Sequence, residues 1–247
     1  MQLLTMDFDG VIADSISECA VVGYNGYEAY CGNNFRIKTP EEIKPDQLRK
    51  FRSMRSYIRS GEDYVYLFHA LNENINIESQ EDFDVFHTAY FDRKDSYYQM
   101  FYSARRTLMS SNHKSWIALN PLYNGMYEFL QTVQNKIHII STKASKYIIE
   151  ILISNGIEIN PKRVHEAGRG FSKKDIIIRL MREYKLSMSN MIFIDDHFDT
   201  LRKVKSIGVR CMLAGWGYNT NKQHSRCQDL NLELIDLQQF YKEFKGL

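Results

Sequence analysis

Two aspartates stand one residue apart near the start of the chain, directly after an apolar run. Residues 3–6 suit a buried strand, which would deliver Asp7 and Asp9 to its carboxyl end. Open α/β sheets bind their ligands at that edge. Side chains two positions apart lie on the same face of a regular strand, and Gly10 gives the chain freedom to turn directly after Asp9. We therefore expect both carboxylates to face one cleft.

Paired carboxylates of this kind can do chemistry. Close carboxylates repel each other and are tolerated mainly when a cation or a shared proton neutralises them, so a hard metal ion is the simplest partner. A carboxylate is also a usable nucleophile at neutral pH, and a neighbouring acid can exchange a proton with a leaving group. Aspartates in turns at strand ends are common, however, so the rest of the chain must supply partners.

The stretch DFDGVIADS, residues 7–15, resembles the first motif of the haloacid dehalogenase superfamily, DxDGx(V/L)xDS, most of whose members are phosphatases. The resemblance implies that Asp7 attacks phosphorus and becomes an aspartyl phosphate. It also implies that Asp9 is the general acid and base, and that Asp7 and the backbone carbonyl of Asp9 help to bind Mg²⁺.

Hydroxyl side chains follow a second short apolar run, residues 137–140. Ser141 matches the Ser or Thr with which the family binds a phosphoryl oxygen, and Thr142 takes the following position. A hydroxyl group and the backbone N–H groups of a helix start together form an anion site. Ser and Thr also cap helices routinely, which is the simpler explanation for either residue alone.

A lysine at the start of a later helix is the next family feature. In GRGFSKKDIIIRLMREYKL the spacing to the apolar residues makes Lys173 the match, for holding the nucleophile and the phosphate by charge, and Lys174 remains an alternative. Solvent exposure is the simpler explanation for whichever lysine has no such role.

Two further acids end another apolar strand, residues 191–194. By the family pattern Asp196 is the expected Mg²⁺ ligand, with Asp195 in support. Asp199 either serves as an additional acid or caps the following helix and pairs with Lys203, and we favour the cap. The later AGWGYN, residues 214–219, resembles the WGY sequence of phosphoglycolate-phosphatase-like relatives.

Between the first and second strands the pattern is helical for about a hundred residues, with apolar and aromatic side chains three and four positions apart. This insertion resembles the helical cap of one branch of the superfamily (C1). We expect an α/β fold: a Rossmann-like core with a parallel sheet, formed by residues 1–15 and 115–247, and an all-helical cap, residues 16–114. Such a cap would act as a lid that excludes water, whereas the simpler alternative is a subdomain that only adds stability.

Composition excludes several other classes. A formal net charge of +2, from 32 basic and 30 acidic side chains, gives no electrostatic case for nucleic acid or an anionic membrane as partner. No apolar segment approaches the roughly 18 residues of a membrane helix, and no secretory signal is evident. Four widely spaced cysteines indicate reduced thiols. We therefore expect a cytoplasmic protein.

Taken together, the motifs predict a Mg²⁺-dependent phosphatase that hydrolyses a small phosphorylated metabolite through an aspartyl phosphate. A phosphomutase would share every core residue and differ in its products. A non-catalytic regulatory or binding protein on the same scaffold would be expected to have lost a core acid. A carbon–halogen hydrolase usually lacks the second aspartate. Neither the substrate nor the oligomeric state follows from the sequence.

Overall fold

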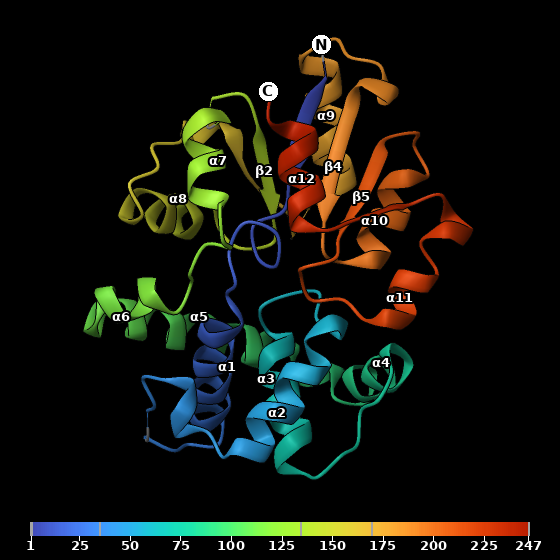
Figure 1. The fold of residues 1–247 in the computed structure, drawn as a ribbon. Coiled ribbons are helices and arrows are strands. Elements are labelled where there is room, and N and C mark those ends of the chain that lie inside the picture. Colours follow the sequence, from blue (N-terminus) through green and yellow to red (C-terminus); the bar gives the residue numbers. More distant parts are fainter. Residues whose placement is uncertain (1, 35, 134, 169, 247) are drawn as a thin grey trace. The chain divides into compact units, whose positions relative to one another are not determined.

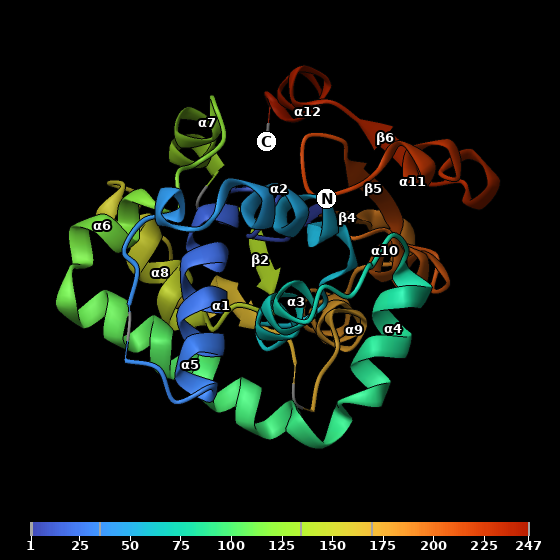
Figure 2. The ribbon, with the colours of Figure 1, turned by 90° about the horizontal axis from the view of Figure 1, so that it is seen from below.

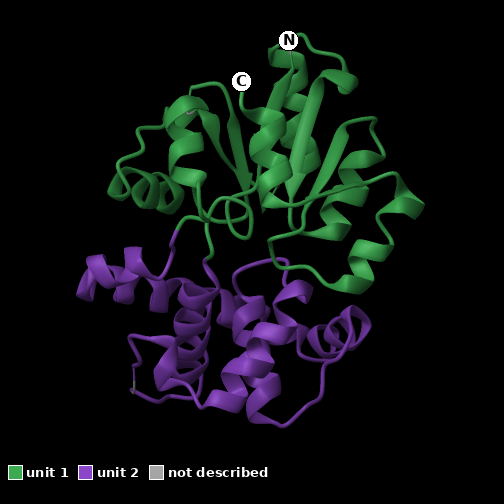
Figure 3. Cartoon of the chain, in the orientation of Figure 1, with its two compact units in different colours: residues 1–14, 122–247 green, residues 15–121 purple. Residues whose placement is uncertain are grey.

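The chain folds into two compact units. The structure is a computed structural model and describes residues 2–34, 36–133, 135–168 and 170–246. One unit consists of residues 1–14 and 122–247, and the other of residues 15–121 (Figure 3). The chain thus passes from one unit to the other after residue 14 and returns after residue 121. The boundaries expected from the sequence were residues 15 and 114.

The first unit is built on a six-stranded parallel sheet with strand order β3-β2-β1-β4-β5-β6 (Figure 1). The strands are β1 (Leu3–Met6), β2 (His138–Ser141), β3 (Val164–Glu166), β4 (Met191–Asp195), β5 (Arg210–Ala214) and β6 (Glu233–Ile235). Every residue of β1, β2 and β4 is buried, as expected for strands covered on both faces. The predicted α/β fold with a parallel sheet is confirmed.

Helices cover both faces of this sheet. They are α7 (Met126–Val133), α8 (Ser145–Ser154), α9 (Lys173–Glu183), α10 (Phe198–Lys205), α11 (Asn221–Ser225) and α12 (Leu237–Phe244). Figure 2 shows α7 and α12 on one side of the strands and α9 on the other, and the rings of Phe129 and Phe240 join α7 to α12 with centroids 4.7 Å apart. The layers bury both faces of the sheet.

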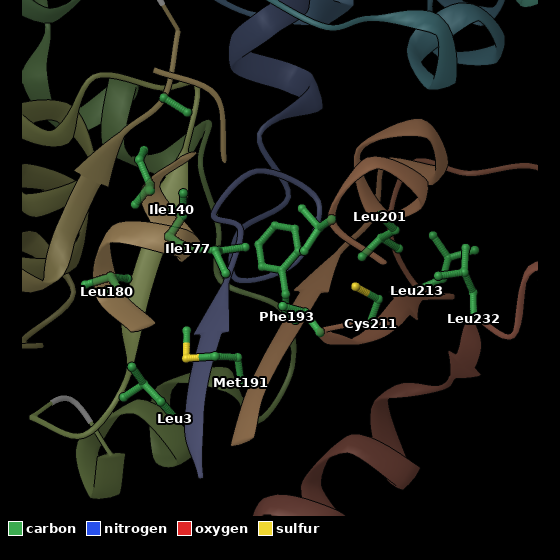
Figure 4. Close-up of a cluster of buried hydrophobic side chains, with 14 of the residues drawn as sticks. Leu3, Ile140, Ile177, Leu180, Met191, Phe193, Leu201, Cys211, Leu213 and Leu232 are labelled. Carbon is green, nitrogen blue, oxygen red and sulfur yellow. The ribbon is translucent and has the colours of Figure 1, made fainter. Parts of the chain in front are cut away.

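An apolar cluster fixes α9 and α10 against the sheet. It includes Ile177 and Leu180 from α9, Leu201 from α10, and Phe193 and Leu213 from the strands, all at 0% exposure (Figure 4). Removing a large side chain from such a core costs about 3–5 kcal/mol. This apolar packing sets the positions of α9 and α10 on the sheet.

Strand β1 lies at the point where the chain reverses its direction across the sheet. From β1 the chain continues to β2 and β3 on one side, and then crosses to β4, β5 and β6 on the other. Crossovers that depart in opposite directions leave a crevice at the carboxyl ends of the strands, where open α/β sheets bind ligands. Asp7, Ser141 and Asp195 stand at these ends.

The helices of the second unit are its regular secondary structure over the described residues, which confirms the predicted helical insert after the first strand. Its helices are α1 (Ile16–Tyr30), α2 (Pro45–Met54), α3 (Asp63–Asn72), α4 (Gln80–Ala89), α5 (Lys94–Ser111) and α6 (His113–Ala118). The helical pattern is interrupted at two points. Pro45 forces extended backbone on Lys44 and starts α2 afresh, and Tyr90 leaves helical geometry between α4 and α5.

A buried ion pair joins the two longest helices of this unit. Arg105 of α5 donates from Nε and Nη2 to the two carboxylate oxygens of Glu18 on α1, at 2.7 and 2.9 Å. Glu18 is 0% and Arg105 3% exposed, and the indole of Trp116 donates to Glu18 as well. Each charge is thus compensated where water cannot reach it.

Replacing one partner of this pair will destabilise the helical unit strongly. We expect Arg105→Met to cost about 3–5 kcal/mol in the free energy of unfolding, because Glu18 is left charged and buried. The double variant Glu18→Met/Arg105→Met will cost less than Arg105→Met alone. Arg59→Met is the control, since Arg59 and Asp84 form an ion pair with side chains more than 40% exposed, worth about 1 kcal/mol or less. Equal losses in chemical denaturation for Arg105→Met and Arg59→Met would contradict this assignment.

Two histidines on neighbouring strands face each other. His138 Nδ1 of β2 lies 2.8 Å from His165 Nε2 of β3, and His138 Nε2 lies 3.0 Å from the hydroxyl of Tyr184. Burial, followed by the charges of His165 and Arg163, lowers the pKa of His138 to about 3. Burial and Arg179 also lower the pKa of His165. The pair is therefore neutral in the folded protein at neutral pH.

This pair predicts a loss of stability in acid. The unfolded chain binds a proton at His138 near its ordinary pKa of 6.5, whereas the folded protein does not until about pH 3. Stability is therefore complete above pH 6.5 and falls as the pH drops from 6.5 toward 3. His138→Asn will flatten the dependence of unfolding free energy on pH between 6.5 and 5, and His113→Gln in the helical unit will not. An unchanged slope in His138→Asn would rule the pair out as its source.

Candidate active site

Three buried carboxylates converge at the carboxyl edge of the sheet. Asp7 follows β1, Asp195 ends β4 and Asp196 follows it, at 6, 0 and 4% exposure. One carboxylate oxygen from each lies within 4.8 Å of the others. Such closely spaced oxygens are the donor set that hard divalent cations such as Mg²⁺ prefer, so these residues fit a cation site.

The turn after β1 is closed tightly. The backbone N–H groups of Ile12 and Ala13 donate to the carbonyl of Phe8, each at 2.9 Å, and the N–H of Gly10 donates to the carbonyl of Ala13. Gly10 has a φ of +80°, and a Cβ here would overlap Asp196 Oδ2. A glycine is therefore required both for the turn and for the close approach of Asp196.

Lys173 is the cation that compensates these acids in the structure. Its Nζ donates to Asp7 Oδ2 at 2.5 Å and to Asp195 Oδ2 at 2.8 Å. Lys173 is the first residue of α9, behind a capping box of Ser172 and Asp175. Lys174 Nζ instead donates to Ser206 Oγ at 3.4 Å.

The charge balance shifts the pKa values of both groups. Burial raises the pKa of Asp7 to about 6 against the attraction of Lys173, with further increases from Asp195 and Asp9. Burial alone would lower the pKa of Lys173, but the attraction of Asp195 and Asp7 is larger and raises it. Lys173 is therefore charged at neutral pH.

Asp9 is placed differently from the other acids. Its side chain is 17% exposed, and Oδ1 accepts a hydrogen bond from Lys143 Nζ at 2.8 Å. Lys143 is itself 3% exposed. The role of Lys143 was not predicted from the sequence. The available signal was its position two residues after Ser141, the hydroxyl residue at the end of β2.

The predicted hydroxyl residues occupy the end of β2. Ser141 is 1% exposed, and its Oγ accepts a long hydrogen bond from the Lys143 amide at 3.3 Å. Thr142 is exposed and lines a pocket of about 490 Å³ together with Lys173, Lys174, Thr200 and Lys203.

Asp199 is not part of the acidic cluster. The cap of α10 is His197, whose side chain accepts from the Thr200 amide, and Asp199 lies 3.5 Å from Arg202 rather than pairing with Lys203. The expectation that Asp199 caps this helix was therefore wrong. The N-cap is the residue before the first helical one, and α10 begins at Phe198.

Comparison with solved structures places this geometry in a known fold. A haloacid dehalogenase-like hydrolase from Streptococcus pneumoniae aligns with a TM-score of 0.63 at 12% identity, over 99% of this chain and 98% of that one. A predicted phosphatase from Clostridium acetobutylicum gives 0.58 and 12%, over 100% and 99%. A predicted phosphoglycolate phosphatase from Haemophilus somnus gives 0.61 and 14%, over 98% and 97%.

The chain therefore has the haloacid dehalogenase-like fold, with a helical insert after its first strand, as in the C1 arrangement. No protein-family model matches the sequence, and no curated protein does. Among the described residues, no helix is long and apolar enough to cross a membrane.

The acidic cluster predicts stabilisation by a divalent cation. At a Mg²⁺ concentration one hundred times the dissociation constant, the free energy of unfolding of the wild type will rise by about 3 kcal/mol, since only the folded chain assembles the three acids. Asp196→Asn will lose most of this increase, and Asp199→Asn will keep it. Thermal melts with Mg²⁺ or EDTA measure the difference for each variant. An equal response of wild type and Asp196→Asn would show that the cation binds elsewhere.

Proposed function

We propose that the protein is a Mg²⁺-dependent phosphoric monoester hydrolase that acts on a small phosphorylated metabolite through an aspartyl phosphate on Asp7. The observation that carries this proposal is the burial of Asp7, Asp195 and Asp196 within 4.8 Å of one another beside Lys173, at the ligand-binding edge of the sheet. The haloacid dehalogenase-like fold agrees with it.

Each residue has a role in the first half of the reaction. Asp7 attacks phosphorus through a carboxylate oxygen, the bond from phosphorus to the ester oxygen breaks, and Asp9 gives its proton to the departing alcohol. Lys173 and Ser141 hold phosphoryl oxygens by charge and by hydrogen bonding. A Mg²⁺ ion held by Asp7, the carbonyl of Asp9 and Asp196, with Asp195 in support, would offset the negative charge of the phosphate.

The second half regenerates the enzyme. Asp9, now a carboxylate, takes a proton from water, and the resulting hydroxide attacks the phosphorus of the aspartyl phosphate. The bond between phosphorus and the Asp7 oxygen then breaks and inorganic phosphate leaves. Lys143 lies 2.8 Å from Asp9 and holds this carboxylate in place. Thr142 follows Ser141 at the end of β2 and helps to bind the phosphate there.

The charges that line the pocket support an anionic substrate. Lys173, Lys174 and Lys203 line the pocket beside Thr142, which favours an anionic ligand. Phosphoglycolate belongs in the first panel of phosphorylated metabolites, because a similar structure is described as a predicted phosphoglycolate phosphatase. The helical unit would act as a cap that excludes water during the reaction.

Removing the nucleophile tests the mechanism. Asp7→Asn will reduce phosphate release from the best substrate of the panel by at least about 10³-fold, because the amide cannot form the acyl phosphate. Asp199→Asn will retain activity, and EDTA will abolish it in the wild type. The readout is inorganic phosphate, which also separates hydrolysis from phosphoryl transfer within a sugar phosphate. Turnover at the wild-type rate in Asp7→Asn would remove Asp7 as nucleophile.

A further inference from the structure

A segment with many hydrogen bonds follows β5 and lies beside the acidic cluster. We call residues 215–219, with the sequence GWGYN, the brace. The amide of Gly215 donates to the carbonyl of Ile235 at 2.9 Å, which ties the brace to β6. The amide of Gly217 and the side chain of Asn219 both donate to the carbonyl of Ala214, at 2.9 and 2.8 Å. The segment is thus fixed to the sheet at both ends.

The brace holds the carboxylate of Asp196 directly. The backbone N–H of Tyr218 donates to Asp196 Oδ2 at 2.9 Å, and Asn219 Nδ2 donates to the Asp196 carbonyl at 3.3 Å. Hydrogen bonds to the ligands of a metal ion orient those ligands and tune their affinity for the ion. The backbone N–H of Tyr218 makes such a hydrogen bond to Asp196, the expected cation ligand.

The same segment also holds the turn that carries Asp7 and Asp9. The indole Nε1 of Trp216 donates to the carbonyl of Val11 at 3.1 Å, and the hydroxyl of Tyr218 donates to Asp14 Oδ1 at 2.6 Å. Asp14 is the last residue of the α/β unit before the chain enters the helical unit. The brace therefore joins the two strand ends from which the acids come.

This fit depends on the absence of a side chain at Gly217. A Cβ at this position would overlap the carbonyl oxygen of Gly10 and the Cβ of Asp196. A Cβ at Gly10 would in turn lie 2.8 Å from a ring carbon of Tyr218. Backbone from three separate parts of the chain is thus packed without a gap around Asp196.

We propose that the brace is a positioning element of the cation site, in which Tyr218 acts through its amide on Asp196 and through its phenol on Asp14. The proposal rests on the cation site of the proposed function. Removing the hydroxyl of Tyr218 releases its side chain from Asp14. The backbone N–H of Tyr218 then no longer holds the carboxylate of Asp196 in its set position, and the site binds a divalent cation less tightly.

Metal binding without substrate is the first test. Tyr218→Phe will raise the dissociation constant for Mn²⁺, followed by electron paramagnetic resonance, about tenfold. Tyr241→Phe is the matched control, because its hydroxyl donates to the carbonyl of Asn124 at 2.8 Å rather than to Asp14. In turnover, Tyr218→Phe will raise the Mg²⁺ concentration for half-maximal rate by the same factor, while kcat and substrate KM at saturating Mg²⁺ stay within about twofold.

A backbone variant tests the fit. Gly217→Ala will weaken Mn²⁺ binding about 100-fold. Gly215→Ala is the control and will weaken it less than threefold, because the atom nearest to its added methyl group is the carbonyl oxygen of Ile235, at 3.0 Å. Circular dichroism checks that each variant is folded. If Gly217→Ala does not fold, Tyr218→Phe decides. The double variant Asp14→Ala/Tyr218→Phe will bind no more weakly than Tyr218→Phe alone, since both remove one interaction.

The outcomes separate the brace from the proposed function. Wild-type Mn²⁺ affinity in both Tyr218→Phe and Gly217→Ala would overturn the brace and leave the phosphatase proposal standing. A wild type that binds Mn²⁺ but hydrolyses no phosphate ester would overturn the phosphatase, and the brace would then be judged on binding alone. A wild type that binds no divalent cation would overturn both.

Discussion

The compensation of buried negative charge is the constraint on which the α/β unit depends. Asp7, Asp195 and Asp196 are almost fully buried, and Lys173 supplies the positive charge through short contacts to two of them. A buried acid without such a partner costs several kcal/mol. One lysine leaves the cluster net negative, so the site is electrostatically prepared for a further cation, and phosphate chemistry gives such an ion a use.

The fold assembles this cluster from distant parts of the sequence. Asp7 and Asp195 end adjacent parallel strands, so their proximity follows from the pairing of β1 with β4, while Lys173 arrives on the first turn of α9. The apolar cluster beneath α9 and α10 fixes the position of that turn. Lys143 and the 215–219 segment then hold Asp9 and Asp196 from outside the cluster. The helical unit has its own buried ion pair and aromatic packing.

The sheet and the helical insert could be predicted because short apolar runs and helical spacing are local signals. The placement of Asp7, Asp195 and Asp196 at strand ends followed from the same runs. The spacing favoured Lys173 and left Lys174 as an alternative. Neighbours on a helix differ by about 100° in direction, and the tertiary structure shows that Lys173 contacts the acids. Three further contacts depend on the positions of side chains in the folded chain. They are the ion pair of Lys143 with Asp9, the cap of α10 by His197 and the hydrogen bond from Tyr218 to Asp14. The last of these joins residues 204 positions apart, which no local pattern reveals.

The most direct test of the central idea is anomalous diffraction from crystals of the wild type grown with Mn²⁺. We expect an anomalous peak at bonding distance from carboxylate oxygens of Asp7 and Asp196, with Lys173 still in contact with Asp195. A peak elsewhere on the molecule, with Asp7 and Asp196 unchanged and no ion between them, would contradict the account that these acids are gathered to hold one divalent cation.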